Sequence, residues 1–202
     1  MIILNRNQLT SWLPTYATEK IVNLSKRSIA FIDARTFIGL SHIANLSLNM
    51  NSLKAIDSSV FDDLMSLIDL NLSENFLASI EPNLFTKLQS LFSLNLGFNK
   101  LTTLNTGTFN SLPNLHILKL DHNQLTRIEA STFSRLTKLS YLYLNNNNLL
   151  LIDRLSFLGL VNLEVVYLAS NPVTMTQPST ILQLCLTNPK CSICMYDVCD
   201  HK

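Results

Sequence analysis

The chain has 202 residues, a formal net charge of +1 and 14% charged residues. Proteins that bind polynucleotides usually carry a large positive excess, and 15 Lys and Arg against 14 Asp and Glu provide none, so no nucleic-acid partner is expected. No apolar run approaches the ~18 residues of a membrane-spanning helix. The hydrophobic fraction of 47% indicates a well-buried core.

Residues 1–20 are predicted to be an incomplete or degenerate first unit of a repeat that continues along the chain. The strand, asparagine and leucine positions of that repeat are filled here by Ile2, Leu4, Asn7, Leu9 and Trp12. No apolar stretch typical of a secretion signal follows Met1, and no polar end cap is visible. Two explanations fit: the chain is part of a longer protein, or the bare first strand pairs with another chain, as exposed sheet edges tend to do.

Residues 21–173 carry a motif that recurs every 24 residues. In one unit it reads Leu67, Leu70, Leu72, Asn75, Leu77 and Ile80, followed by Phe85 and Leu88. The asparagines with this period are Asn51, Asn75, Asn99, Asn123, Asn147 and Asn171, and the phenylalanines are Phe37, Phe61, Phe85, Phe109, Phe133 and Phe157. Repeats of this length are typical of solenoids, in which each unit forms one coil.

The alternation within each unit predicts one short strand with a single buried face. Leu70 and Leu72 are expected to point inward, whereas Asp69, Asn71 and Ser73 point outward. Successive strands then stack about 4.8 Å apart in a parallel sheet. The asparagine falls where the chain leaves the strand, so its amide is expected to bond backbone groups that the turn leaves unpaired. The phenylalanines are expected to form a second core on the opposite side.

This pattern resembles the leucine-rich repeat family, specifically its phenylalanine-containing, mostly extracellular subclass. The resemblance implies an α/β solenoid, a curved horseshoe segment with a concave parallel sheet of about eight short strands. It also implies a binding module found in receptor ectodomains and other extracellular proteins, and hence an extracellular or cell-surface location as part of a longer protein. A cytoplasmic scaffold is the alternative.

The outward strand positions form two rows along the predicted concave face, where solenoids bind partners. Early units present small polar groups from Asn45 to Asn95, and later ones present an aromatic and apolar patch. Tyrosine is enriched at interfaces, although neighbouring tyrosines also simply pack along a sheet. The candidate ligand-binding residues are Ile117, Lys119, Asp121, His122, Tyr141, Tyr143, Val165 and Tyr167.

No catalytic site, cofactor or metal is predicted for this chain. None of the four histidines lies in a sequence context that suggests catalysis, and four glycines leave no room for a glycine-rich phosphate loop. Asp121 and His122 are adjacent and are expected at the concave surface, either as a hydrogen-bonded pair or as two solvated side chains. All coils have the same length, so no inserted loop is available to carry an active site.

Three N-glycosylation sequons begin at Asn23, Asn45 and Asn71, all on the polar side of the predicted concave face. Chance alone predicts about as many in a chain so rich in asparagine and serine. If the protein is secreted, sugars at these positions would restrict binding to the tyrosine side.

Residues 174–202 are predicted to form a cysteine-containing C-terminal cap. Residues 179–187 can form a short amphipathic helix that covers the open core. Two disulfides are expected by analogy with similar extracellular proteins, with three connectivities that the sequence does not separate. The alternatives are a zinc site, for which only Cys191 and Cys194 have the usual spacing, and reduced thiols. The four cysteines are Cys185, Cys191, Cys194 and Cys199.

The sequence therefore predicts a solenoid over residues 1–173 and a cap over 174–202. Its expected function is non-catalytic protein binding through the concave face, with no membrane span. The alternatives are a structural or self-assembling protein that associates through its N-terminal edge, and an intracellular regulatory scaffold.

Overall fold

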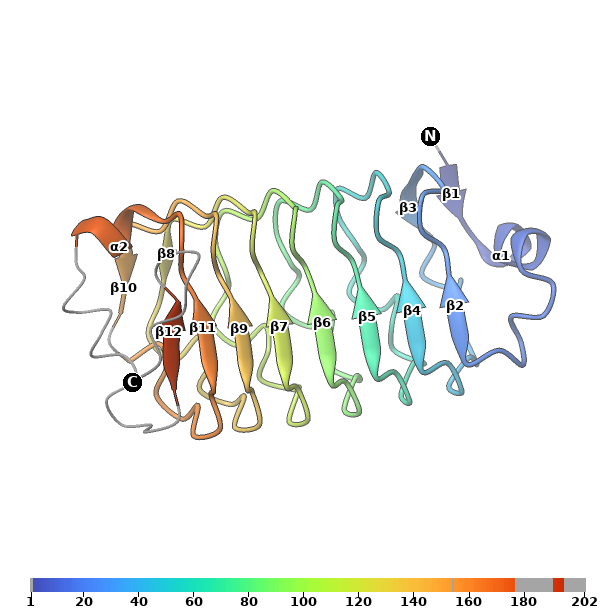
Figure 1. Ribbon diagram of the computed structural model, residues 1–202. Coiled ribbons are helices and arrows are strands. Elements are labelled where there is room, and N and C mark those ends of the chain that lie inside the picture. Colours follow the sequence, from blue (N-terminus) through green and yellow to red (C-terminus); the bar gives the residue numbers. More distant parts are fainter. Residues whose placement is uncertain (1, 154, 177–190, 195–202) are drawn as a thin grey trace.

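The computed structural model describes residues 2–153, 155–176 and 191–194. Its main feature is a parallel sheet of eight short strands that lie side by side along the molecule (Figure 1). In spatial order they are β2 (Ile21–Asn23), β4 (Asn45–Ser47), β5 (Asp69–Asn71), β6 (Ser93–Asn95), β7 (Ile117–Lys119), β9 (Tyr141–Tyr143), β11 (Val165–Tyr167) and β12 (Ser192–Cys194). The predicted solenoid with a parallel sheet of about eight strands is confirmed.

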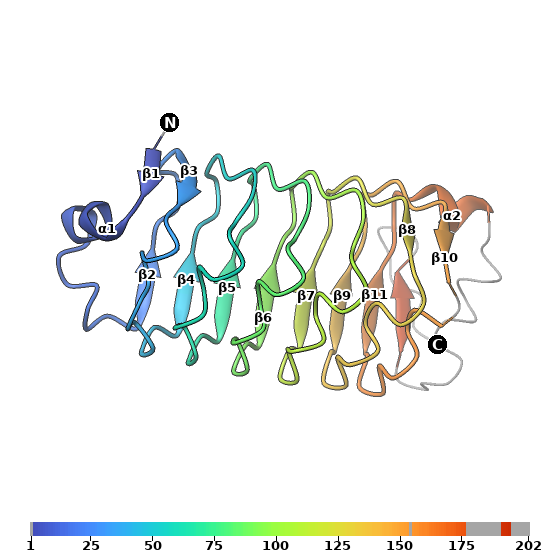
Figure 2. The ribbon, with the colours of Figure 1, turned by 180° about the vertical axis from the view of Figure 1, so that it is seen from behind.

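The register of the sheet follows the sequence period. From β2 to β11 each residue pairs with the one 24 positions further along, as Leu70 does with Leu94 and Leu94 with Leu118. The central residue of each of these strands is buried and the two flanking residues are more accessible, as the alternation predicts. Figure 2 shows from behind how the rest of each unit runs over the other side of the solenoid before the next strand begins.

The repeated asparagines connect neighbouring coils. Asn99, for example, accepts a hydrogen bond from the backbone N–H of Leu77 (3.1 Å), and its Nδ2 donates to the carbonyl oxygens of Leu72 and Leu96 (3.0 Å each). The same pattern recurs at Asn75, Asn123, Asn147 and Asn171. The predicted role in satisfying backbone groups is confirmed, and the bonds reach into the preceding coil as well as the asparagine's own turn.

The repeated phenylalanines form the expected second core. Five of the six side chains, from Phe37 to Phe133, have no exposed surface, and Phe157 is 7% exposed. The rings of Phe37 and Phe61 stack, and so do the neighbouring rings from Phe85 to Phe157, with centroids 6.1–6.4 Å apart. One continuous hydrophobic core therefore runs through all the coils.

The repeat positions predicted for the N-terminal residues were wrong. Residues 2–4 form β1 (Ile2–Leu4), which does not join the main sheet but pairs in parallel with β3 (Ile29–Ile32). Residues that were assigned to the asparagine and leucine positions instead form helix α1 (Arg6–Trp12). The helix begins because the Asn5 side chain accepts a hydrogen bond from the Gln8 N–H (2.9 Å), a typical N-cap.

The same segment covers the core at the N-terminal end. Leu4 and Leu9 are fully buried and Tyr16 nearly so, while Trp12 and Leu13 pack against the core. The Thr36 hydroxyl donates to the carbonyl oxygen of Leu4 (3.0 Å) and ties the segment to the coil behind it. A second small sheet, formed by β8 (Arg127–Ile128) and β10 (Leu151–Ile152), lies near the other end (Figure 2).

At the C-terminal end, α2 (Pro172–Thr176) follows the last regular strand, and β12 adds the eighth strand beside β11. That strand was not predicted. The predicted helix over 179–187, together with Cys185 and Cys199, lies outside the described residues. Among the helices that the structure describes, none has the length and apolar character needed to cross a membrane.

Candidate functional site

The outward side chains of the main sheet form a surface that we call the sheet face. Its polar half consists of the outward residues of β4 to β6, which are Asn45, Ser47, Asp69, Asn71, Ser93 and Asn95. Its tyrosine half consists of those of β7, β9 and β11, which are Ile117, Lys119, Tyr141, Tyr143, Val165 and Tyr167. The strand register places the members of each half next to one another, as the sequence predicts.

Three side chains of one row of the tyrosine half are in direct contact. The rings of Tyr143 and Tyr167 stack with centroids 4.4 Å apart and planes 11° apart. The Lys119 ammonium lies 5.1 Å from the centre of the Tyr143 ring, within the range of a cation–π interaction. Burial is the main cause that raises the pKa of Tyr143, followed by the nearby Tyr167. The row is thus a pre-arranged, uncharged aromatic surface with one cation at its end.

The other row of the tyrosine half includes a tyrosine held by a carboxylate. The Tyr141 hydroxyl donates a hydrogen bond to Glu164 Oε2 (2.9 Å). This hydrogen bond, and then the negative charge of Glu164, raise the pKa of Tyr141 above its ordinary value. Because the bond fixes the phenol, Tyr141 presents a defined polar edge beside the apolar side chains of Ile117 and Val165.

Asp121 and His122 form a hydrogen-bonded pair, one of the two arrangements expected from the sequence. His122 Nδ1 lies 3.0 Å from Asp121 Oδ2, and the imidazole stacks on Phe98 with ring centres 3.9 Å apart. His122 has a φ of 52°, as do the equivalent residues of neighbouring units within a few degrees. A side chain at Gly97 would place its Cβ 2.9 Å from Asp121 Oδ1, so the glycine leaves room for this carboxylate. The pair therefore lies where the strands end, beside the sheet face.

The polar half contains a shallow hollow of about 240 Å³, lined by side chains and backbone of β4, β5 and β6. Asn45 Nδ2 donates to Asp69 Oδ2 (2.8 Å) on the adjacent strand. Asn71 and Asn95 each accept a hydrogen bond from the backbone N–H two residues further on (3.0 Å each). These asparagines are thus partly engaged in hydrogen bonds with their own chain.

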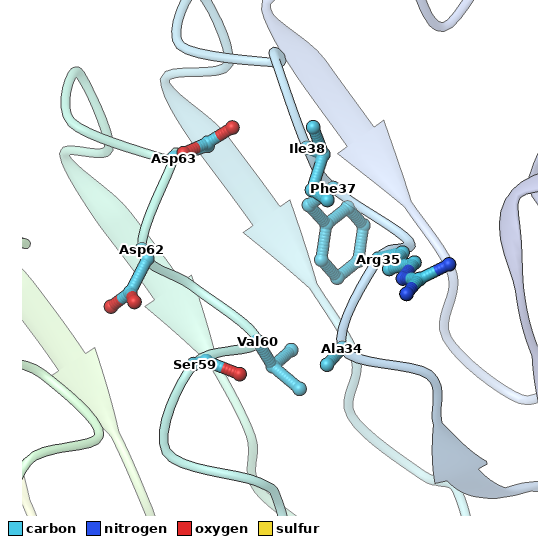
Figure 3. A pocket seen from close by; sticks show the side chains of 8 residues that line it. All are labelled: Ala34, Arg35, Phe37, Ile38, Ser59, Val60, Asp62 and Asp63. Carbon is cyan, nitrogen blue, oxygen red and sulfur yellow. The ribbon is translucent and has the colours of Figure 1, made fainter.

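A separate pocket of about 300 Å³ lies away from the sheet face (Figure 3). Asp62 and Asp63 line it from one coil, and Arg35 and Ile38 line it from the preceding coil. Among the residues that the structure describes, no group of three or more histidine, cysteine, aspartate or glutamate side chains could hold a metal ion. The pocket was not predicted from the sequence.

Three neighbours of the candidate residues were not predicted from the sequence. Glu164 and Phe98 contact Tyr141 and His122, respectively. Phe98 could have been found, because it precedes His122 by one repeat and so occupies the same position of the adjacent coil. The third neighbour is β12, which extends the sheet beside Val165 and Tyr167.

Comparison with known proteins gives a consistent result. A family model described as "Leucine rich repeat" matches residues 20–77, 66–125 and 113–173, which is well over half of the chain. A search of curated proteins found no significant match.

Among solved structures, a TLR13–ssRNA13 complex resembles the chain with a TM-score of 0.78 and 31% identity, over 85% of this chain and 24% of that one. The Drosophila Toll–Spatzle complex, in its glycosylated form, has a TM-score of 0.79 and 23% identity, over 91% and 26%. A second Toll–Spatzle structure gives 0.60 and 18%, over 95% and 32%. The chain thus spans a quarter to a third of the length of these proteins.

Proposed function

The chain belongs to the leucine-rich repeat family, and we propose that it is a non-catalytic module that binds a protein ligand through the tyrosine half of its sheet face. The observation that carries this proposal is the contiguous, partly exposed patch formed by Tyr141, Tyr143 and Tyr167 with Lys119. Stacked tyrosines offer a large contact area with little loss of side-chain freedom, as hot-spot residues of interfaces do.

The charges of the sheet face support a protein ligand over a polynucleotide. The two halves carry one cation, Lys119, and one carboxylate, Asp69, and the side chains of Asp121 and Glu164 lie beside the tyrosine half. Binding to the phosphate backbone needs several cations that neutralise it. The TLR13 structure was solved with an RNA, whereas the sheet face of this chain carries a single cation, Lys119.

The geometry beside the sheet face supports a non-catalytic role. Within the described part of the chain, His122 is hydrogen-bonded to Asp121 and stacked on Phe98, and neither of these two partners is a nucleophile for the histidine to activate. The pair is better placed to contribute a polar rim to a binding surface.

An extracellular or cell-surface location, with disulfides in the C-terminal cap, is part of the proposal. The structural resemblance to Toll-like receptor ectodomains supports it. Cys191 and Cys194 are both buried, and neither is a free thiol. Cap cysteines that are paired favour an oxidising compartment. Titration of thiols in the denatured, unreduced protein tests this: four free thiols would contradict it and favour the intracellular scaffold.

The binding proposal is tested by screening the purified chain against an array of secreted and cell-surface proteins. For any protein that binds, we expect the double variant Tyr143→Ala, Tyr167→Ala to weaken binding by at least about tenfold, as loss of one hot-spot residue does. The matched control is the double variant Asn71→Ala, Asn95→Ala on the polar half, which is expected to bind normally. Loss of binding in the control variant and not in the tyrosine variant would contradict the proposal.

Self-assembly through the N-terminal end is the second candidate. It is favoured by two exposed apolar side chains on the small sheet of β1 and β3, Ile3 and Phe31, which are 56% and 48% exposed. This reading predicts a sedimentation coefficient that rises with protein concentration and no longer does so in the variants Ile3→Pro and Ile3→Lys. A wild-type chain that stays monomeric at all concentrations rules it out.

A further inference from the structure

The three sequons differ sharply in their surroundings, and we propose that Asn23 is an N-glycan acceptor whereas Asn45 is not. The proposal rests on the secreted location proposed above. Asn23 and Asn71 are the last residues of β2 and β5, whereas Asn45 is the first residue of β4. Their hydrogen bonds and strand neighbours separate them.

Asn23 combines exposure with a compact turn. Its side-chain oxygen accepts hydrogen bonds from the Ser25 hydroxyl (2.6 Å) and from the Ser25 backbone N–H (3.0 Å). Both bonds go to the oxygen, and within the described part of the chain no residue accepts a hydrogen bond from Asn23 Nδ2. The nitrogen to which a sugar attaches is therefore available, and the turn that holds the oxygen does not need it.

The position of Asn23 in the sheet leaves space for a glycan. Strand β2 is the outermost strand of the main sheet at this end and pairs only with β4 (Figure 1). A branched, hydrated glycan requires a surface position with solvent around it. A glycan at Asn23 has a neighbouring strand of the main sheet on one side only.

Asn45 differs in both respects. Its Nδ2 donates to Asp69 Oδ2 (2.8 Å), and Asn45 lies between Ile21 and Asp69 of the flanking strands. A sugar on this nitrogen would have to fit beside the carboxylate that the nitrogen now contacts, within the hollow of the polar half. Asn71 is intermediate: it has the same turn with Ser73 as Asn23 has with Ser25, but strands flank it on both sides.

The reaction is the transfer of an oligosaccharide from a lipid diphosphate donor by the transferase of the secretory pathway. The bond between Asn23 Nδ2 and the anomeric carbon forms, and the bond from that carbon to the phosphate oxygen breaks. The lipid diphosphate leaves with the electron pair, and a base of the transferase takes one proton from Nδ2. No oxidant or reductant is needed.

The test is to secrete the full chain from cultured eukaryotic cells behind a foreign signal peptide and to measure occupancy at each sequon by mass spectrometry after enzymatic release of the glycans. Recovery from the medium proves entry into the pathway. We expect Asn23 to be occupied in most molecules and Asn45 in few. The variants Asn23→Gln and Ser25→Ala should both lose one glycan in mass, whereas Ser25→Thr, which keeps the sequon, should retain it.

An unoccupied Asn23 in the secreted protein would overturn the proposal, and so would an Asn45 occupied as fully as Asn23. Ligand binding by the Tyr143→Ala, Tyr167→Ala variant is measured on the same secreted material. Because that variant keeps all three sequons, loss of the glycan and loss of ligand binding are distinguishable results.

Discussion

The two halves of the sheet face share one backbone and differ almost entirely in their side chains. Strands β4 to β6 and strands β7, β9 and β11 have the same register and the same buried leucines or valine beneath them. On the outward side, Asn45 and Asp69 of the polar half are joined by a hydrogen bond, and the rings of Tyr143 and Tyr167 of the tyrosine half stack. The outward residues can therefore differ from one coil to the next while the coils themselves stay the same.

The largest expected effect on stability comes from the buried core that both halves share. Phe109 is fully buried beneath their boundary and stacks on Phe85 and Phe133. The variant Phe109→Ala should lower the free energy of unfolding by about 3–5 kcal/mol. Denaturant titration measures the loss.

The same titration can follow the two ends of the solenoid separately. Trp12 is the only tryptophan and reports on the N-terminal end, whereas three of the five tyrosines, Tyr141, Tyr143 and Tyr167, report on the other. Because coils are coupled through nearest neighbours, Phe109→Ala should destabilise both ends. A midpoint that hardly moves would refute the role of the phenylalanines.

A smaller loss of stability is expected when one of the repeated asparagines that join neighbouring coils is removed. Asn99→Ala removes the partner of the Leu77 N–H and of the Leu72 and Leu96 carbonyl oxygens. Buried unsatisfied groups cost about 1–3 kcal/mol, and the unfolding free energy should fall by that order. The control Ser93→Ala, on the polar half, should change it by less than about 0.5 kcal/mol. Equal effects of the two substitutions would show that the asparagine contributes no more than a surface side chain.

The smallest expected effect concerns the titration of the phenol groups of the sheet face, which only the tyrosine half contains. The hydrogen bond to Glu164 raises the pKa of Tyr141, and burial raises that of Tyr143, above the ordinary value of about 10. Folding therefore favours the neutral phenols, and this contribution is complete below pH ~10 and is lost as the pH rises through the folded pKa values.

Ultraviolet absorbance of the phenolate measures this titration. In the wild-type chain part of the tyrosine signal should appear at higher pH than in the denatured chain. Glu164→Gln should bring the pKa of Tyr141 back towards its ordinary value, and Tyr141→Phe should remove that part of the signal altogether. A titration unaffected by Glu164→Gln would show that the carboxylate does not hold the phenol in solution.

Much of the fold could be predicted because the repeat is regular. A spacing of 24 residues between equivalent positions is also the offset between paired residues from β2 to β11, so the sequence alone indicates the sheet, the asparagine ladder and the phenylalanine core. The candidate residues of the sheet face follow from the same count. Whether they bind a ligand stays a prediction.

The ends of the solenoid could not be predicted in this way, because their pairs break the period. Ile2 pairs with Ile29, and Val165 with Ser192, each 27 residues away. Ile2, Leu4, Asn7 and Leu9 match the spacing of the repeat, but the Asn5 cap favours a helix over the turn that Asn7 would make. A single match to a short motif is weak evidence, because a local signal such as a helix cap can override it. Six matches in register are strong evidence for the repeat.

The sequence by itself thus determined the coil, since its buried leucines, asparagines and phenylalanines recur with the period at which coils stack. Only the tertiary structure decided which outward side chains touch. The contacts of Tyr141 with Glu164 and of His122 with Phe98 join neighbouring coils. The reason is physical. The same positions are buried in every coil, so apolar residues recur periodically in the sequence, whereas a contact between two exposed side chains depends on their rotamers and on their immediate neighbours.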